Sequence, residues 1–179
     1  MGRPSEEKYQ EFHAAVGEAI CYWTQVERAL LGLFVWALES AHPRAASAAY
    51  YANMNFKAKL DVVDNTLVAR LSQPDVSNDP KSHVLKFDDP LLSTWATLEK
   101  RLRRRAKKRN DIAHFETMIY ANELVLVAPM RSPLNFAKLI LDDRFESRLS
   151  VKDIRAITNE FRDVCEAIRN FEKELRQTL

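Results

Sequence analysis

A long apolar stripe near the end of the chain restricts the fold most. Seven apolar residues recur there at intervals of three or four positions: Ile154, Ile157, Phe161, Val164, Ile168, Phe171 and Leu175. This spacing places them on one face of an α-helix, and such a face is normally buried against other elements. Ser150 and Asp153 resemble a capping box, which marks the start of the helix. The segment therefore predicts a long amphipathic helix.

Three earlier segments share this helical periodicity. The first spans about residues 5–41, and its apolar positions are Val16, Ile20, Trp23, Leu30 and Phe34. The second spans about residues 44–71, with a break expected near residues 52–55. The third spans about residues 89–111. With the last segment, the sequence predicts four long helical regions.

The remaining segments are expected to be loops and one hairpin. Residues 72–90 hold three prolines and predict a loop. Residues at about 115–128 are rich in β-forming types and predict a small hairpin that turns around Ala121-Asn122. Residues 129–149 are expected to be irregular or to hold one short helix. We expect one mainly α domain over residues 1–179, an antiparallel four-helix-bundle-like arrangement with the hairpin inserted before the last helix.

The composition supports a folded helical protein. Hydrophobic residues make up 46% and charged residues 29% of the 179 positions, as is usual for folded domains, and only three glycines are present. No glycine-rich phosphate loop occurs. Cys21 and Cys165 lie far apart on apolar helical stripes, which predicts two buried thiols and no disulfide. The histidines and cysteines show no metal-ligand spacing, so we expect neither a metal nor a cofactor.

The sequence predicts a cytoplasmic protein that does not enter a membrane. Its first residues are polar and lack the apolar core of a signal peptide. Its most apolar window, residues 29–38, is too short to span a bilayer.

The charge of the chain is concentrated in one segment. Eight of the ten residues from Lys100 to Arg109 are Lys or Arg, and none is acidic. Removing these eight charges from the net charge of +2 leaves −6 for the other 169 residues. A charge run on a helix is often only a solvated face. A concentrated cationic element also suits the phosphates of a nucleic acid.

A helical wheel at about 100° per residue divides this segment into two sides. The buried stripe is expected to hold Trp95, Leu98, Leu102, Ala106 and Ala113. The cations on the opposite side are expected to contact an RNA backbone without reading its sequence. They are Lys100, Arg101, Arg103, Arg104, Lys107 and Lys108.

Arg109 lies on the buried stripe of the wheel, where an unpaired guanidinium is unfavourable. Glu27 lies on the apolar stripe of the first helix, between Trp23 and Leu30. Two interpretations are open. Either Glu27 and Arg109 form a buried ion pair between two helices, or Glu27 orients Arg109 for binding phosphate. The two interpretations are also compatible with each other.

His114 follows Arg109 by five positions. On a straight helix these two side chains lie about 140° apart and do not face each other. Either the helix ends or kinks near Ile112, or the two side chains meet through a second copy of the chain.

The segment Arg109-Asn110-Asp111-Ile112-Ala113-His114 resembles the R-x4-6-H motif of the HEPN superfamily, whose members often carry a polar residue directly after the arginine. The helical segments and the position of the motif before the last helix resemble that family as well. Residues 23–27 and 56–60 are similar to those of uncharacterised bacterial members.

The resemblance implies a metal-independent endoribonuclease that acts as a homodimer, with the Arg and His of both protomers in one cleft. The product then ends in a 2′,3′-cyclic phosphate. Arg109 is expected to bind phosphate and stabilise the transition state, and His114 to act as acid or base. Asn110 is expected to contact the phosphate or to fix His114. A further hypothesis is that the chain is the toxin of a toxin–antitoxin or phage-defence system, with an antitoxin as partner.

Two other functions fit the same residues. A catalytically silent module of this type would bind nucleic acid or a nucleotide by charge alone. A structural helical dimer would use Glu27 and Arg109 only as a core ion pair and would have no activity toward RNA.

Overall fold

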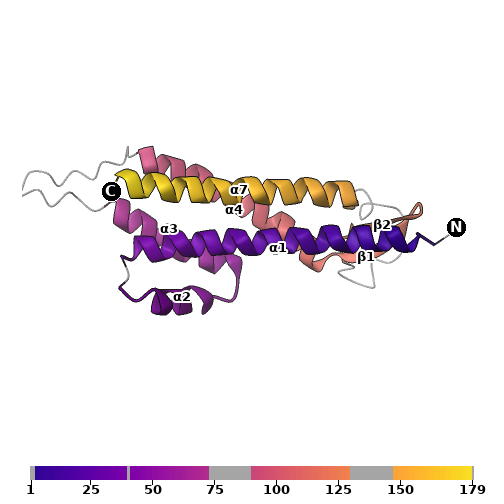
Figure 1. The fold of residues 1–179 in the computed structure, drawn as a ribbon, viewed down its shortest axis with the longest axis horizontal. Coiled ribbons are helices and arrows are strands. Elements are labelled where there is room, and N and C mark those ends of the chain that lie inside the picture. Colours follow the sequence, from indigo (N-terminus) through magenta and orange to yellow (C-terminus); the bar gives the residue numbers. More distant parts are fainter. Residues whose placement is uncertain (1–2, 40, 73–89, 130–146, 179) are drawn as a thin grey trace, which may run out of the picture. The chain divides into compact units, whose positions relative to one another are not determined.

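The computed structural model describes residues 3–39, 41–72, 90–129 and 147–178, and these residues are mainly helical (Figure 1). The described elements are α1 (Glu6–Ala37), α2 (Pro43–Tyr51), α3 (Phe56–Leu71), α4 (Pro90–His114), β1 (Glu116–Tyr120), β2 (Glu123–Val127) and α7 (Val151–Thr178). The predicted mainly α fold with a small hairpin before the last helix is confirmed. Most of the predicted loop at 72–90 and of the irregular segment at 129–149 lies outside the described residues.

The predicted break near residues 52–55 is confirmed, and it separates α2 from α3. Pro43 occupies the first turn of α2, where its missing N–H is not needed. Asn55 begins α3 because its side-chain Oδ1 accepts a hydrogen bond from the Ala58 N–H at 2.8 Å.

The capping box at the start of α7 is confirmed. The Ser150 hydroxyl donates to Asp153 Oδ2 at 2.6 Å, and the Ser150 N–H donates to the same oxygen at 2.9 Å. The Asp153 N–H donates back to Ser150 Oγ at 3.3 Å. All seven residues of the apolar stripe that follows are buried.

The hairpin is confirmed with the predicted turn. β1 and β2 pair antiparallel, and Tyr120 lies opposite Glu123. The two turn residues, Ala121 and Asn122, have φ values of 48° and 64°, which the mirror-image turns of tight hairpins require. Residues 124–127 of β2 are buried, whereas β1 is exposed along its whole length.

The chain forms two compact units. Unit 1 comprises Met1–Thr24 and Arg105–Arg162, and unit 2 comprises Gln25–Arg104 and Asp163–Leu179. The boundaries fall inside α1, α4 and α7, so each of these helices contributes one part to each unit.

In unit 1, α1 and α7 run in the same direction (Figure 1). Glu11 pairs with Arg155 at 3.0 Å and Glu18 with Arg162 at 3.9 Å, so both helices advance by seven residues between the pairs. Trp23 packs edge-on against Phe161 with the ring centroids 5.0 Å apart. The expected antiparallel arrangement is therefore wrong for this helix pair.

In unit 2, α3 has one parallel and one antiparallel neighbour. It pairs with α1 through Lys59–Glu27 and with Glu39, two residues after the end of α1, through Arg70. These two ion pairs advance in the same direction along both segments. Its contacts to α4, Asp64–Trp95 and Asp61–Arg103, advance in opposite directions. The antiparallel expectation thus holds for α3 with α4 and fails for α3 with α1.

Two further expectations about single residues are wrong. Cys21 is exposed, since it lies about 160° around α1 from the buried Trp23; Cys165 is buried, and neither thiol forms a disulfide. The third predicted helix continues to His114 instead of ending near residue 111, since no glycine or proline interrupts it.

In the described part of the chain, no helix is long and apolar enough to cross a membrane.

Candidate functional site

The buried side of α4 agrees with the helical wheel over most of its length. Trp95, Leu98 and Leu102 are all buried. Near the end of the helix the prediction fails, because Ala113 is exposed and Ile112 is buried in its place. The buried face thus rotates over the last turns of α4, where Ile112 lies about 80° from Leu102.

The six predicted RNA-binding cations differ in exposure. Lys100, Arg103, Arg104 and Lys107 are exposed, whereas Arg101 and Lys108 are half-buried. The structure thus leaves four of them exposed and partly covers the other two.

Two of these cations already have acidic partners. Arg103 pairs with Glu99 on its own helix and with Asp61 of α3, at 2.8 Å to the latter. Hydrogen bonds from Lys57 and from Arg103 lower the pKa of the Asp61 carboxyl below its ordinary value. Lys108 pairs with Glu160 of α7 at 2.9 Å.

The Arg109 guanidinium is half-buried and fixed by its neighbour. Its Nη1 donates to the side-chain Oδ1 of Asn110 at 3.1 Å. Its Nε is buried and has no hydrogen-bond partner among the residues that the structure describes. A buried donor without a partner is unfavourable.

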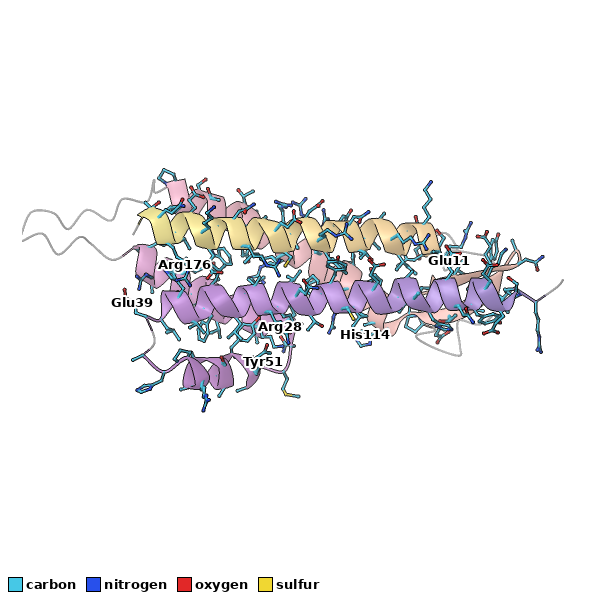
Figure 2. The ribbon with its side chains drawn as sticks, viewed as in Figure 1. Glu11, Arg28, Glu39, Tyr51, His114 and Arg176 are labelled. Carbon is cyan, nitrogen blue, oxygen red and sulfur yellow. The ribbon has the colours of Figure 1, made fainter. Side chains whose placement is uncertain are left out.

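His114 is the last residue of α4 and is exposed to solvent (Figure 2). The helix continues through Ile112 to this residue. The contact through a second copy of the chain stays a prediction.

Glu27 is bound by a lysine that the sequence reasoning did not identify. Its carboxylate lies 2.6 Å from the Lys59 ammonium, and the two side chains are 16% and 12% exposed, respectively. The Lys59 ammonium also lies 5.7 Å from the centre of the Tyr50 ring and 5.3 Å from that of Tyr51. A signal was present in the sequence, since Lys59 precedes the apolar Val63 by four positions and shares its helical face.

The ion pair of Glu27 and Lys59 connects residues 23–27 with residues 56–60. These are the two stretches on which the family resemblance also depends. Tyr50 adds to this cluster through its hydroxyl, which donates to the backbone carbonyl of Glu27 at 3.1 Å. Burial raises the pKa of Tyr50 above its ordinary value, so the hydroxyl keeps its proton.

Arg105 and Glu160 are two further residues of the site region that the sequence reasoning did not select. Arg105 Nε lies 3.1 Å from Glu160 Oε2 in unit 1. Arg105 could have been selected from the helical wheel, because it lies only about 40° from Arg109. Its charge alone did not distinguish it from the other cations.

The chemistry available on α4 is that of an arginine, an amide and an imidazole beside a cationic surface. Such groups bind phosphate oxygens and move protons without a metal ion. Within the described residues, no three His, Cys, Asp or Glu side chains gather in a way that would hold a metal. No protein-family model, curated protein or solved structure matches this chain.

Proposed function

We propose that this chain is a metal-independent endoribonuclease of the HEPN type, with Arg109, His114 and Asn110 as its catalytic residues. The observation that carries the proposal is the state of Arg109. Its guanidinium is held by Asn110 through one nitrogen, while its buried Nε lacks an acceptor among the described residues. This arginine lies in the last two turns of the helix that ends at the exposed His114.

The reaction needs only the groups that this site offers. The ribose 2′-oxygen attacks the adjacent phosphorus, and the bond from phosphorus to the 5′-oxygen breaks. The 2′-hydroxyl loses a proton and the leaving 5′-oxygen gains one, which leaves a 2′,3′-cyclic phosphate and a 5′-hydroxyl. Imidazole transfers protons near neutral pH, and the Arg109 guanidinium stabilises the charge on the phosphate oxygens.

The substrate class follows from the nucleophile. DNA has no 2′-hydroxyl, so only RNA, or a chain with at least one ribonucleotide, is cleaved. Lys100, Arg101, Arg104 and Lys107 attract and hold the RNA backbone through charge.

The proposal includes a homodimeric four-helix HEPN-type bundle in the cytoplasm. Two copies bring their Arg109 and His114 side chains into one cleft, since the two residues lie about 140° apart around α4 of a single chain. We further propose that the chain is the toxin of a toxin–antitoxin or phage-defence system, with an antitoxin protein as partner. Glu27 contributes by fixing α1 against α3 through Lys59.

The test is cleavage of single-stranded and structured RNA by the purified protein in EDTA. We expect Arg109→Ala and His114→Ala each to lower the cleavage rate by about 100-fold or more, because each removes a group that acts in the transition state. Arg44→Ala and His13→Ala are matched controls, since both replace exposed residues far along the sequence from the site. Circular dichroism checks that every variant is folded.

The outcome also separates the alternatives. No cleavage by the wild type, or equal cleavage by all variants, would show that the proposal is wrong. Binding of RNA that weakens with salt but yields no product would indicate a silent binding module. Negligible binding, with a lowered melting temperature for Arg109→Ala, would indicate a structural helical protein.

A further inference from the structure

One acidic residue of α7 holds two cations of α4 in unit 1. Both carboxylate oxygens of Glu160 accept from the Lys108 ammonium, at 3.1 and 2.9 Å. Oε2 also lies 3.1 Å from Arg105 Nε. All three side chains are partly covered, with exposures of 31% for Glu160, 39% for Lys108 and 26% for Arg105. This carboxylate therefore restricts two long side chains that would otherwise move freely.

Arg105 is bound through one edge only. Its ion pair with Glu160 is formed through Nε, and no hydrogen bond from its two Nη atoms is found within the described residues. The two Nη atoms keep four N–H donors, which suit two oxygens of a phosphate. A guanidinium held through Nε by a carboxylate has lost much of its rotational freedom, so binding an anion with the remaining edge costs less entropy.

Arg105 and Arg109 share one side of α4. Four residues separate them, which on an ideal helix gives an offset of about 40° and a rise of about 6 Å. That rise is comparable to the spacing of successive phosphates along an RNA strand. Two guanidinium groups so placed match two neighbouring phosphates of one strand.

We propose that Arg105, positioned by Glu160, binds the phosphate next to the one held by Arg109. This inference rests on the proposed function and deepens it, because it assigns the substrate a second contact that sets which linkage is cleaved. Glu160 is a positioning residue in this scheme, and it leaves the site cationic. One carboxylate offsets one of the three charges of Arg105, Lys108 and Arg109.

The test uses oligonucleotides that contain a single ribonucleotide in an otherwise deoxy strand. One phosphate at a time, on either side of the scissile linkage, is replaced by a neutral methylphosphonate. We expect one neighbouring replacement to lower kcat/KM of the wild type by about 10-fold or more, since it removes a hydrogen-bonded charge pair. We expect Arg105→Ala to cleave the all-phosphate strand about as slowly as the wild type cleaves the methylphosphonate strand. In this variant the methylphosphonate replacement should not lower kcat/KM further.

A binding measurement separates this inference from the proposed function. The affinity of an uncleavable all-deoxy strand, with and without the methylphosphonate, is followed by fluorescence anisotropy. If no strand is cleaved but Arg105→Ala still abolishes the methylphosphonate effect on affinity, the proposed function is wrong and the phosphate site remains. If the methylphosphonate lowers affinity and kcat/KM equally in wild type and Arg105→Ala at every position, the inference is overturned.

Glu160→Ala tests the positioning role. We expect it to lower kcat/KM and to weaken the methylphosphonate effect, since Arg105 loses its support. A rise in RNA affinity and kcat/KM would instead show that Glu160 competes with phosphate, which contradicts the role assigned here. Glu18→Ala is the matched control, because it removes another ion pair to α7, Glu18–Arg162, without touching α4.

Discussion

At the scale of single residues, the ion pair of Glu27 and Lys59 holds two helices of unit 2 together. The carboxylate and the ammonium are 2.6 Å apart and both side chains are largely covered. The neighbouring rings of Tyr50 and Tyr51 exclude water from the ammonium and attract its charge. Removing one partner of such a pair leaves the other charge poorly solvated, which destabilises more than the pair itself stabilises.

We therefore predict that Lys59→Met and Glu27→Gln each lower the free energy of unfolding by about 2 kcal/mol. The double variant should lose less than the sum, because each single change already breaks the same pair. Urea denaturation of the four proteins measures this coupling. Lys57→Met is the control: its pair with Asp61 is exposed, so a change of about 0.5 kcal/mol or less is expected. Additive losses at Glu27 and Lys59 would contradict the prediction.

The sequence indicated that Glu27 needs a cation and suggested Arg109, whereas the structure shows an ion pair with Lys59. A carboxylate on an apolar helical stripe requires a partner, and this follows from the residue types alone. The choice of Lys59 depends on which helix lies beside α1, which a helical wheel cannot give. The same limit applies to Arg105, whose role becomes visible only through Glu160 on α7.

At the scale of elements, the start of α7 depends on the pair of Ser150 and Asp153. Hydrogen bonds from the Ser150 side chain and backbone lower the pKa of Asp153 below its ordinary value. A lowered folded-state pKa means that the ionised carboxylate stabilises the fold at and above the ordinary pKa of about 3.9. This contribution is lost as the pH falls through the lowered folded-state pKa.

We predict that Asp153→Ala destabilises the protein by about 1 kcal/mol at pH 7, the usual value of such a cap. The difference in melting temperature between wild type and variant should shrink as the pH is lowered below about 4, because the wild type then loses the same contribution. Asp163→Ala, an exposed change in the middle of the same helix, serves as control. A gap between wild type and Asp153→Ala that stays constant down to the lowest pH tested would argue against the cap.

Local signals predicted the elements well and their directions poorly. Periodicity located the helices, the turn residues located the hairpin, and Ser150 with Asp153 located the start of α7, since all of these depend on neighbours in sequence. The parallel run of α1 and α7 in unit 1 depends on the long connections between them. The relative direction cannot be predicted from the residues of either helix. It becomes visible in the structure through the ion pairs of Glu11 and Glu18 with α7.

At the scale of the whole molecule, the positive charge available to a ligand is smaller than the sequence suggests. Three of the eight cations between positions 100 and 109 have carboxylate partners, namely Arg103, Arg105 and Lys108. In the part of the chain that the structure describes, the other five form no ion pair with an acid: Lys100, Arg101, Arg104, Lys107 and Arg109. A cation that keeps its carboxylate releases no counterion when RNA binds.

The salt dependence of RNA binding measures how many of these cations contact RNA phosphates. Five unpaired cations predict a slope of log K against log salt of about −3.5 for a single strand, whereas all eight would give about −5.6. His114→Ala keeps the RNA intact during the measurement. In that background Lys107→Ala should reduce the slope by about 0.7, while Arg103→Ala should leave it nearly unchanged because Asp61 and Glu99 hold that side chain. An equal reduction by both variants would show that the Arg103 ion pairs open when RNA binds, and that the whole basic run acts on the ligand.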